Sequence, residues 1–148
     1  MTRSVCVLAA LCLLLSTSHQ AKEKVTWHDC GKPTDLGKVH NITVDPNPLH
    51  VGPVVVTGNF TLYDHVTRGS RVETVINMGL YSFKQVYSFC DMAGLVSLSC
   101  PFKKGPLEIV YKAPDSQTGP IGSIYKIDAV IKDQNGKQLF CLNMTIPL

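Results

Sequence analysis

The fold is decided by residues 123–146, which read SIYKIDAVIKDQNGKQLFCLNMTI. Residues 123–133 alternate apolar with charged side chains, and residues 138–146 repeat the alternation. The Asn-Gly pair at 135–136 between them is typical of a β-hairpin turn. Because successive side chains of a strand point to opposite faces, each of the two strands is predicted to bury one face and expose the other to water. The buried face is predicted to carry Tyr125, Ile127, Ala129, Ile131, Phe140, Leu142, Met144 and Ile146.

The same period of two recurs upstream, with prolines and glycines between the apolar stretches. Candidate strands are residues 24–30, 38–44, 54–63, 71–78 and 106–111. With the closing hairpin this makes about seven short antiparallel strands. The pattern predicts an all-β fold, an immunoglobulin-like two-sheet antiparallel β-sandwich.

Composition limits the function classes. The chain has 148 residues, a charged fraction of 17% and a hydrophobic fraction of 45%, which supports one ordinary domain and excludes a disordered chain. The formal net charge is only +3, and no run of basic residues is longer than Lys103-Lys104. A nucleic-acid binder usually has a clustered basic face, so nucleic acid is not an expected partner.

The first residues have the pattern of a secretory signal peptide. Arg3 precedes the apolar stretch Val5–Leu15, and small residues follow up to Ala21. Eleven apolar residues are too few to cross a membrane, which takes about twenty. We therefore predict a signal peptide over residues 1–21 and one domain over 22–148, secreted to the extracellular space or the lysosomal lumen. An uncleaved N-terminal anchor is the alternative.

Four cysteines remain after the predicted signal peptide, an even number that indicates two disulfides in an exported chain. Four cysteines allow three connectivities. We favour Cys30–Cys141, which would join the opening strand to the closing strand, and Cys90–Cys100, which would close a loop. A zinc site is the alternative, but no pair has C-x-x-C spacing, so no metal and no cofactor are expected.

Asn41, Asn59 and Asn143 each begin an Asn-x-Thr sequon, the acceptor sequence for N-glycosylation. Each asparagine is out of phase with the apolar residues beside it in its predicted strand. Glycans at these positions are therefore predicted to point to water, and the protein is predicted to be a glycoprotein.

Residues 80–98, which read LYSFKQVYSFCDMAGLVSL, break the alternation and carry only two charged residues. The stretch is too apolar for a plain connection. It either covers an open edge of the sandwich, or faces an apolar ligand or a bilayer, or is an ordinary core strand followed by a packed loop.

Motifs of catalysis are missing from the sequence. No nucleophile elbow, phosphate-binding loop, zincin helix or dinucleotide fingerprint is present. His28 and Asp29 are neighbours on a predicted strand, so their side chains point to opposite faces and form no dyad. His40, His50 and His65 are interpreted as surface or capping residues. The protein is predicted not to be an enzyme.

Four stretches together resemble a known family. They are residues 27–30 (WHDC), 42–48 (ITVDPNP), 100–105 (CPFKKG) and the region from Gly119 to Cys141. Their order and the cysteine placement resemble the ML family of lipid-recognition domains. Within it, the Cys-Pro-Phe-Lys segment is most similar to the ganglioside activator branch. The Asp-Pro-Asn-Pro segment is similar to phosphatidylglycerol/phosphatidylinositol transfer proteins.

The resemblance implies a splayed two-sheet β-sandwich with an internal apolar cavity that holds lipid between its sheets, and the same two disulfides. It implies a protein that extracts, carries or presents a glycolipid or phospholipid, by lipid transfer or as an activator of lipid hydrolysis by a partner enzyme. The implied partners are a lipid (glycolipid, phospholipid or sterol), a transient membrane surface, and a lysosomal hydrolase or receptor. The alternative is an innate-immune or adhesion-type extracellular interaction module.

Burial of hydrocarbon is expected to supply most of the affinity, since each methylene contributes about 0.8 kcal/mol. The candidate cavity wall is the inward phase of the predicted strands, and the candidate membrane and entrance rim lies in and after residues 80–98. The predicted wall residues are Phe60, Leu62, Ile76, Met78, Tyr125, Ile127, Ile131, Phe140, Leu142 and Met144. The predicted rim residues are Tyr87, Phe89, Met92, Leu95, Val96, Leu98, Lys103 and Lys104.

Overall fold

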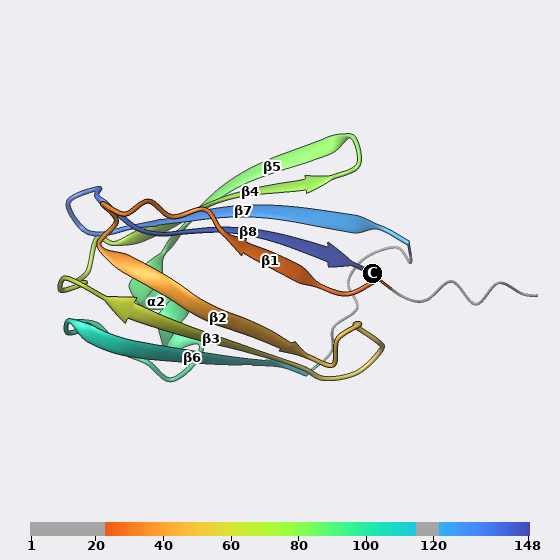
Figure 1. Cartoon of the computed structure of the whole chain (residues 1–148), viewed down its shortest axis with the longest axis horizontal. Coiled ribbons are helices and arrows are strands. Elements are labelled where there is room, and N and C mark those ends of the chain that lie inside the picture. Colours follow the sequence, from red (N-terminus) through yellow and green to blue (C-terminus); the bar gives the residue numbers. More distant parts are fainter. Residues whose placement is uncertain (1–22, 115–121) are drawn as a thin grey trace, which may run out of the picture.

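The computed structural model describes residues 23–114 and 122–148, which form two antiparallel sheets and one short helix (Figure 1). The predicted signal peptide lies outside the described residues. No helix among the described residues is long and apolar enough to cross a membrane. The five-stranded sheet has the order β1 (Thr26–Asp29), β8 (Gln138–Pro147), β7 (Ile124–Lys132), β4 (Arg71–Met78), β5 (Tyr81–Ser88). The three-stranded sheet has the order β2 (Gly37–Asp45), β3 (Val54–Leu62), β6 (Gly105–Ala113), and α2 is Phe89–Gly94.

The predicted all-β, two-sheet architecture is confirmed, and all seven predicted strands are present. In the closing hairpin Ile131 lies opposite Phe140 and Ile127 opposite Met144, so these side chains, predicted to be on the buried face, share one face of the sheet. Its turn is longer than a two-residue Asn-Gly turn. Asp133 is buried there, and its Oδ1 accepts the backbone N–H groups of Asn135 (2.9 Å) and Lys137 (2.7 Å).

An eighth strand, β5, was not among the seven predicted strands, although a core strand was one of the three interpretations of residues 80–98. It pairs only with β4, so it is the edge of the five-stranded sheet, and its residues are exposed along its whole length. An edge strand without a layer opposite it shows no apolar alternation, because neither of its faces is buried. The β4–β5 turn contains Gly79, whose φ of +57° suits the first central position of a tight hairpin turn.

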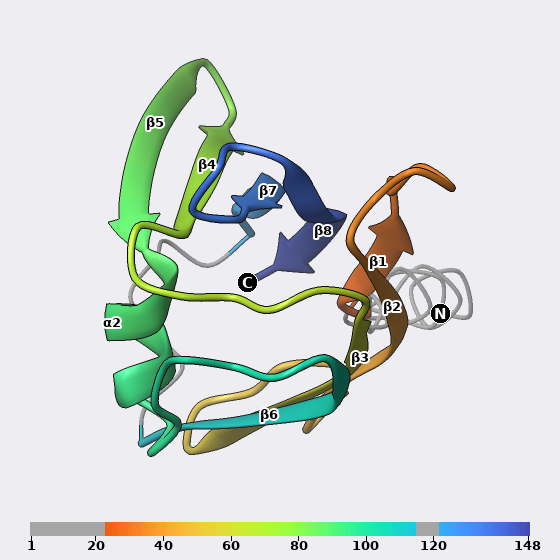
Figure 2. The same ribbon diagram turned by 90° about the vertical axis from the view of Figure 1, so that its left-hand side faces the viewer.

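The helix α2 lies across the gap between the sheet edges β5 and β6 (Figure 2). Ser88 caps it, since its hydroxyl accepts the N–H of Asp91 at 3.2 Å. Phe89, the first residue of α2, is buried, and its ring lies 5.6 Å from the ring of Phe102. Residues 80–98 therefore form an exposed edge strand followed by an anchored helix, a combination of the interpretations above.

Two aromatic rings join the sheets at the centre of the core. Phe60 of β3 and Phe140 of β8 have ring centroids 5.1 Å apart. A Cβ atom on Gly58 would lie 2.5 Å from the Phe60 ring, and one on Gly37 would lie 2.4 Å from the Phe140 ring. The two glycines are therefore required by the close approach of backbone and ring.

Both disulfides have the connectivity favoured from the sequence. Cys30 is bonded to Cys141, across 111 positions of sequence, and joins the end of β1 to β8. Cys90 is bonded to Cys100, across 10 positions, and ties α2 to the segment before β6. One disulfide thus fixes the sheet edge at β1 and the other fixes the helix that spans the opposite edges.

Candidate functional site

The first apolar cavity lies between the sheets beside α2, and we call it the α2-end cavity. Its volume is about 450 Å³. Residues of β4, β7 and β8 form one wall, residues of β3 and β6 form the other, and α2 with the residues after it closes the side. The lining consists of Phe60, Val72, Thr74, Phe89, Met92, Ala93, Leu95, Val96, Ile109, Tyr111, Ala129, Ile131, Phe140 and Leu142.

No charged side chain is among these lining residues. Thr74 and Tyr111 are the only ones with a polar side-chain group, and the Thr74 hydroxyl donates a hydrogen bond to the Gln85 carbonyl at 3.4 Å. An ion placed here would lose its hydration without a compensating partner, which is costly. Hydrocarbon would instead gain free energy by leaving water. The chemistry of the cavity therefore favours an alkyl chain.

The α2-end cavity opens to solvent at the sheet edges. Leu95, directly after α2, is 76% exposed although it lines the cavity, and Met92 and Tyr111 are also exposed lining residues. These three come from α2, the residue after it, and β6, the elements that flank the gap in Figure 2. The opening is therefore bordered by apolar side chains that are already in contact with water.

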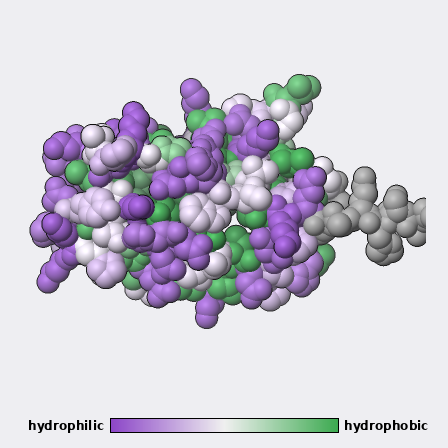
Figure 3. All heavy atoms as spheres, in the orientation of Figure 1, coloured by the Kyte–Doolittle hydropathy of each residue, from purple (hydrophilic) through white to green (hydrophobic). Residues whose placement is uncertain are grey.

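A second exposed apolar surface continues from this opening along the β4–β5 hairpin, and we call it the overhang. Tyr81 lies opposite Met78 in the hairpin and Phe83 opposite Ile76, so all four side chains are on the same face as the cavity residues Val72 and Thr74. Tyr81 is 66% exposed, and the tip residue Leu80 is fully exposed. Figure 1 shows the hairpin projecting away from the three-stranded sheet, and Figure 3 shows hydrophobic atoms at its tip.

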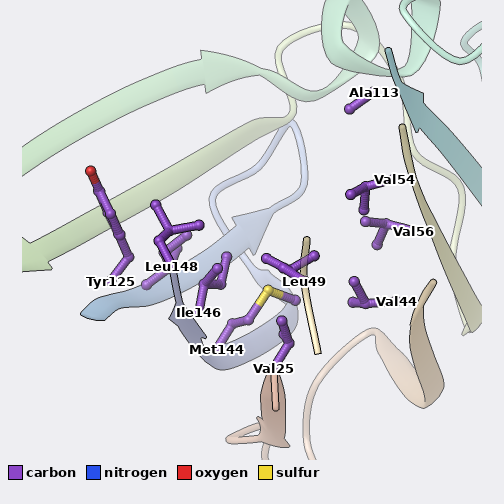
Figure 4. A pocket seen from close by; sticks show the side chains of 11 residues that line it. Val25, Val44, Leu49, Val54, Val56, Ala113, Tyr125, Met144, Ile146 and Leu148 are labelled. Atoms are coloured by element: carbon purple, nitrogen blue, oxygen red, sulfur yellow. The ribbon is translucent and has the colours of Figure 1, made fainter. Parts of the chain in front are cut away.

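The second apolar cavity lies between the sheets near residues 25 and 148, and we call it the termini-end cavity (Figure 4). Its volume is about 280 Å³. Asn47 holds Val25 in its wall, because Asn47 Oδ1 accepts the Val25 N–H (2.8 Å) and Asn47 Nδ2 donates to the Val25 carbonyl (3.1 Å). The lining consists of Val25, Val44, Leu49, Val54, Val56, Ala113, Tyr125, Ile127, Met144, Ile146 and Leu148.

Seven of the ten predicted wall residues line one of the two cavities. Phe60, Ile131, Phe140 and Leu142 line the α2-end cavity, and Tyr125, Ile127 and Met144 line the termini-end cavity.

The other three predicted wall residues line neither cavity. Leu62 is 1% exposed and belongs to the buried core cluster together with Val66 and Leu139. Ile76 and Met78 are on the same face of β4 as the cavity residues Val72 and Thr74, but they lie nearer the hairpin tip and belong to the overhang.

The predicted rim residues divide in a similar way. Met92, Leu95 and Val96 border the α2-end cavity, and Tyr87 is exposed on β5. Lys103 and Lys104 are exposed between the Cys90–Cys100 disulfide and β6.

Two rim predictions need correction. Phe89 is only 6% exposed, because it packs on Phe102 beneath α2, and it lines the cavity from inside. Leu98 is half-buried against the core and contributes little free surface.

Several lining residues were not selected from the sequence. On β3 and β6 the signal was present, because Val54 and Val56 are in phase with Phe60, and Ile109 is in phase with Tyr111 and Ala113. Ala129 was placed on the correct face but was not selected. Val25 precedes β1 but lies in the predicted strand 24–30, so its signal was also present. Leu49 and Leu148 lie outside regular strands, so alternation cannot identify them.

The ion-paired side chains of Arg71, Glu73 and Lys132 lie away from both cavities. Glu73 accepts hydrogen bonds from Arg71 Nε and Lys132 Nζ, each at 2.7 Å, and these two partners lower its pKa below the ordinary value of 4.5. Glu73 is out of phase with the lining residues Val72 and Thr74, so it lies on the outer face of the sheet. Among the described residues, no group of three His, Cys, Asp or Glu side chains is arranged to hold a metal ion.

Comparison with known proteins agrees with this geometry. A phosphatidylglycerol/phosphatidylinositol transfer protein of Mycosarcoma maydis is 25% identical over 124 residues, which cover 81% of this chain and 64% of the fungal protein. This chain thus spans less than two thirds of that relative.

Two solved structures have a similar fold. A Niemann-Pick type C2 protein from Japanese carpenter ant has a TM-score of 0.57 at 17% identity, covering 82% of this chain and 97% of the ant chain. Chicken MD-1, solved in complex with lipid IVa, has a TM-score of 0.51 at 14% identity, covering 81% of this chain and 95% of that chain. The family model for the ML domain matches residues 24–148. The chain therefore belongs to the ML domain family.

Proposed function

We propose that this protein is a non-enzymatic lipid carrier that takes the hydrocarbon of a phospholipid or glycolipid into the α2-end cavity. The observation that carries the proposal is a cavity of about 450 Å³ without charged lining residues, open beside exposed apolar side chains. The head group stays at the opening, near Leu95 and Tyr111, because the lining offers too few polar groups to replace its hydration.

Hydrophobic burial supplies enough free energy for such a complex. At about 0.8 kcal/mol per methylene, a long acyl chain offers on the order of 10 kcal/mol before the costs of ordering are subtracted. A hydrogen bond contributes about 1 kcal/mol net. Affinity therefore comes from the walls, and selectivity among head groups comes from the few side chains at the opening.

The relatives support a phospholipid as the cargo. The Mycosarcoma maydis protein is named for transfer of phosphatidylglycerol and phosphatidylinositol, and chicken MD-1 was solved with lipid IVa. We take a phospholipid as the first candidate, with glycolipid and sterol as the alternatives. An activator role for a lysosomal hydrolase, as the resemblance to the ganglioside activator implies, is a further part of this proposal.

The protein collects its cargo from a membrane surface through the overhang and the cavity opening. Tyr81, Phe83 and Leu95 are exposed apolar side chains on adjacent parts of this surface. Lys103 and Lys104 before β6 are exposed cations that follow Leu95 in the chain, suited to anionic head groups. Contact with the bilayer would cover the apolar surface while the chain passes into the cavity.

We place the protein in the secretory pathway, either outside the cell or in the lysosomal lumen. The support is the predicted signal peptide, the two disulfides and the sequons. Asn41 and Asn59 are exposed and lie directly opposite each other on β2 and β3. Asn143 is half-buried, and its Nδ2 donates to Asp128 Oδ1. All three are proposed glycan sites, on the outer faces of the sheets.

A second candidate function is an innate-immune or adhesion-type interaction module. The observation that favours it is β5, which pairs on one side only and so presents an unpaired strand edge. An exposed edge can accept a strand from another protein. Under this alternative the partner is a receptor or a hydrolase, and lipid, if present, is presented to it.

The proposal is tested by native mass spectrometry of protein purified from a secreting eukaryotic cell line, followed by a vesicle transfer assay. We expect an adduct with a lipid mass and acceleration of phosphatidylglycerol transfer between vesicles. Absence of a lipid adduct together with a transfer rate equal to the protein-free rate would overturn the carrier proposal and leave the interaction module. Loss of mass on treatment with a peptide-N-glycosidase tests the glycan sites in the same sample.

A further inference from the structure

A third hollow, which we call the polar pocket, lies on the β1–β2 side of the molecule. Its volume is about 380 Å³. The end of β1, the residues after it and the beginning of β2 line it, together with Tyr63 after β3 and Phe140 of β8. Figure 2 shows β1 and β2 across the molecule from α2. The polar pocket and the opening of the α2-end cavity are therefore on different sides, and Phe140 is the one residue shared by their described linings.

The wall of the polar pocket is held by bonds of the segment between β1 and β2. At the start of this segment Cys30 is bonded to Cys141 of β8. Further along, Asp35 is only 8% exposed, and its Oδ2 accepts the backbone N–H of Lys32 at 2.7 Å and the side-chain Nε2–H of Gln138 at 2.8 Å. A ligand therefore meets a wall that is already ordered, which lowers the entropic cost of binding.

Positive charge predominates in the polar pocket. Its charged lining residues are Lys32, Lys38 and Asp29, and both lysines are exposed. Within the described part of the chain, neither lysine forms an ion pair with a carboxylate. One oxygen of Asp29, Oδ1, accepts the Gly31 N–H at 2.8 Å. An incoming anion would be attracted by two ammonium groups and would not have to displace an existing ion pair.

The rest of the lining suits a small carbon skeleton attached to the anion. Tyr63 is 46% exposed, and a tyrosine has an apolar body with a polar tip. Benzene in a cavity of about 150 Å³ occupies about 25 Å³ per non-hydrogen atom. At that density the polar pocket, about 380 Å³, holds roughly 15 non-hydrogen atoms. A sugar phosphate is of this size, whereas inorganic phosphate would leave much of the pocket empty.

We infer that the polar pocket binds a phosphorylated sugar or sugar alcohol, outside the α2-end cavity. Lysine is a common ligand of phosphate in proteins, to which it offers a compact positive charge. The phosphate accepts hydrogen bonds from the ammonium groups of Lys32 and Lys38, and the carbon skeleton packs against Tyr63. The phosphate belongs either to a free sugar phosphate or to the head group of a lipid. The inference rests on the polar pocket alone and goes beyond the carrier function proposed above.

Calorimetric titration of the lipid-free protein with glucose 6-phosphate tests the inference. We expect the variant with both Lys32→Gln and Lys38→Gln to bind glucose 6-phosphate about tenfold or more weakly, because two charge-assisted hydrogen bonds are lost. The matched control carries Lys112→Gln and Lys126→Gln, two exposed lysines that do not line the polar pocket. The control has the same net charge, and its affinity should change by less than about twofold in physiological salt. Melting temperatures verify that both variants are folded.

Tyr63→Ala separates the shape of the polar pocket from its charge. We expect this variant to bind glucose 6-phosphate several-fold more weakly and inorganic phosphate with an affinity within about twofold of the wild type, since only the sugar reaches Tyr63. Unphosphorylated glucose should bind more weakly than glucose 6-phosphate. The inference would be overturned if the wild-type protein did not bind glucose 6-phosphate at millimolar concentrations. An equal loss of affinity in the two double-lysine variants would also overturn it.

A second titration, with protein loaded with phosphatidylglycerol, distinguishes the two sources of the phosphate. An unchanged affinity for glucose 6-phosphate would assign the polar pocket to a free sugar phosphate. Loss of glucose 6-phosphate binding in the loaded protein would place the phosphate of the lipid beside Lys32 and Lys38, instead of at the opening near Leu95. If the protein neither binds nor transfers lipid, the carrier proposal fails, whereas the titration of lipid-free protein still decides this inference.

Discussion

The two ends of the inter-sheet space are held by different kinds of bonds. At the α2 end, Cys30–Cys141 flanks the cavity residues Phe140 and Leu142, and Cys90–Cys100 fastens α2. At the other end the described contacts are hydrogen bonds, those of Asn47 with Val25 and that from the Leu148 N–H to the Ser123 carbonyl at 2.9 Å. A cavity lacks the packing that stabilises a solid core. The larger cavity, which opens beside exposed apolar side chains, is therefore the one that has covalent support.

The largest expected effect comes from removing covalent support at the α2 end. Replacement of Cys30 and Cys141 by Ser opens a loop of 111 positions and is expected to lower the free energy of unfolding by about 4–5 kcal/mol. Replacement of Cys90 and Cys100 opens a loop of 10 positions and is expected to cost about 3 kcal/mol or less. Urea denaturation measures both losses.

We expect the opposite order for the effect of the two disulfides on retention of bound lipid. The Cys90 and Cys100 variant loses the fastening of α2 and should release bound phosphatidylglycerol faster than the Cys30 and Cys141 variant, under conditions where both are folded. If the two variants retained lipid equally, α2 would not form part of the binding wall.

At the termini end, Asn47→Ala is expected to lower the free energy of unfolding by about 1–2 kcal/mol, because two hydrogen bonds to Val25 are lost. We expect the variant to weaken binding of two-chain phosphatidylglycerol more than binding of its one-chain lyso form, since only the termini-end cavity is disturbed. Urea denaturation and lipid titration measure the two effects. An equal loss of affinity for both lipids would contradict separate roles for the α2-end and termini-end cavities.

Leu95 and Leu98 both follow α2 near the cavity opening, but Leu95 is exposed and Leu98 is half-buried. Leu95→Ser removes an exposed side chain, so stability should change by less than about 0.5 kcal/mol while transfer between vesicles slows several-fold. Leu98→Ser is the matched control, since Leu98 packs against the core and its loss should lower the melting temperature. A Leu95→Ser variant with the wild-type transfer rate would show that the opening does not contact the membrane.

The smallest expected effect is a loss of stability on removal of the Glu73 ion pairs, which lie on the outer face of the five-stranded sheet. The pKa of Glu73 is lowered in the folded state by Arg71 and Lys132, so its ion pairs stabilise the fold above its ordinary pKa of 4.5. This contribution is lost as the pH falls through the lower, folded-state pKa. Glu73→Gln should therefore lower the melting temperature slightly at pH 7 and at pH 5, and the difference should vanish in stronger acid. A difference that grew toward low pH would contradict this assignment.

Most of the fold was predictable because seven strands have one buried face. Alternation placed Ile127, Ile131, Leu142 and Met144 on the correct side, and the positions of the cysteines in the expected strands and loop favoured the observed disulfides. The strand β5 could not be identified this way, because an edge strand without a facing layer has no buried side to produce the pattern.

The site was less predictable than the fold, since a sequence shows which side chains face inward but not where facing side chains fail to meet. Leu62 and Phe60 have the same phase on β3, yet Leu62 is enclosed and Phe60 borders a cavity. The difference depends on which side chains of the opposite sheet lie across from each of the two residues. Leu49 and Leu148 lie outside regular strands, so only the tertiary structure reveals that they reach the wall.

The central claim is that lipid hydrocarbon lies between the two sheets. Intermolecular nuclear Overhauser effects between a bound phosphatidylglycerol and ¹³C-labelled methyl groups test it most directly. The account predicts contacts from acyl methylenes to the methyl groups of Ile131 and Leu142, and further along to Met144. Contacts confined to Leu80 and Val86 on the exposed hairpin would show binding at the surface alone and would contradict it.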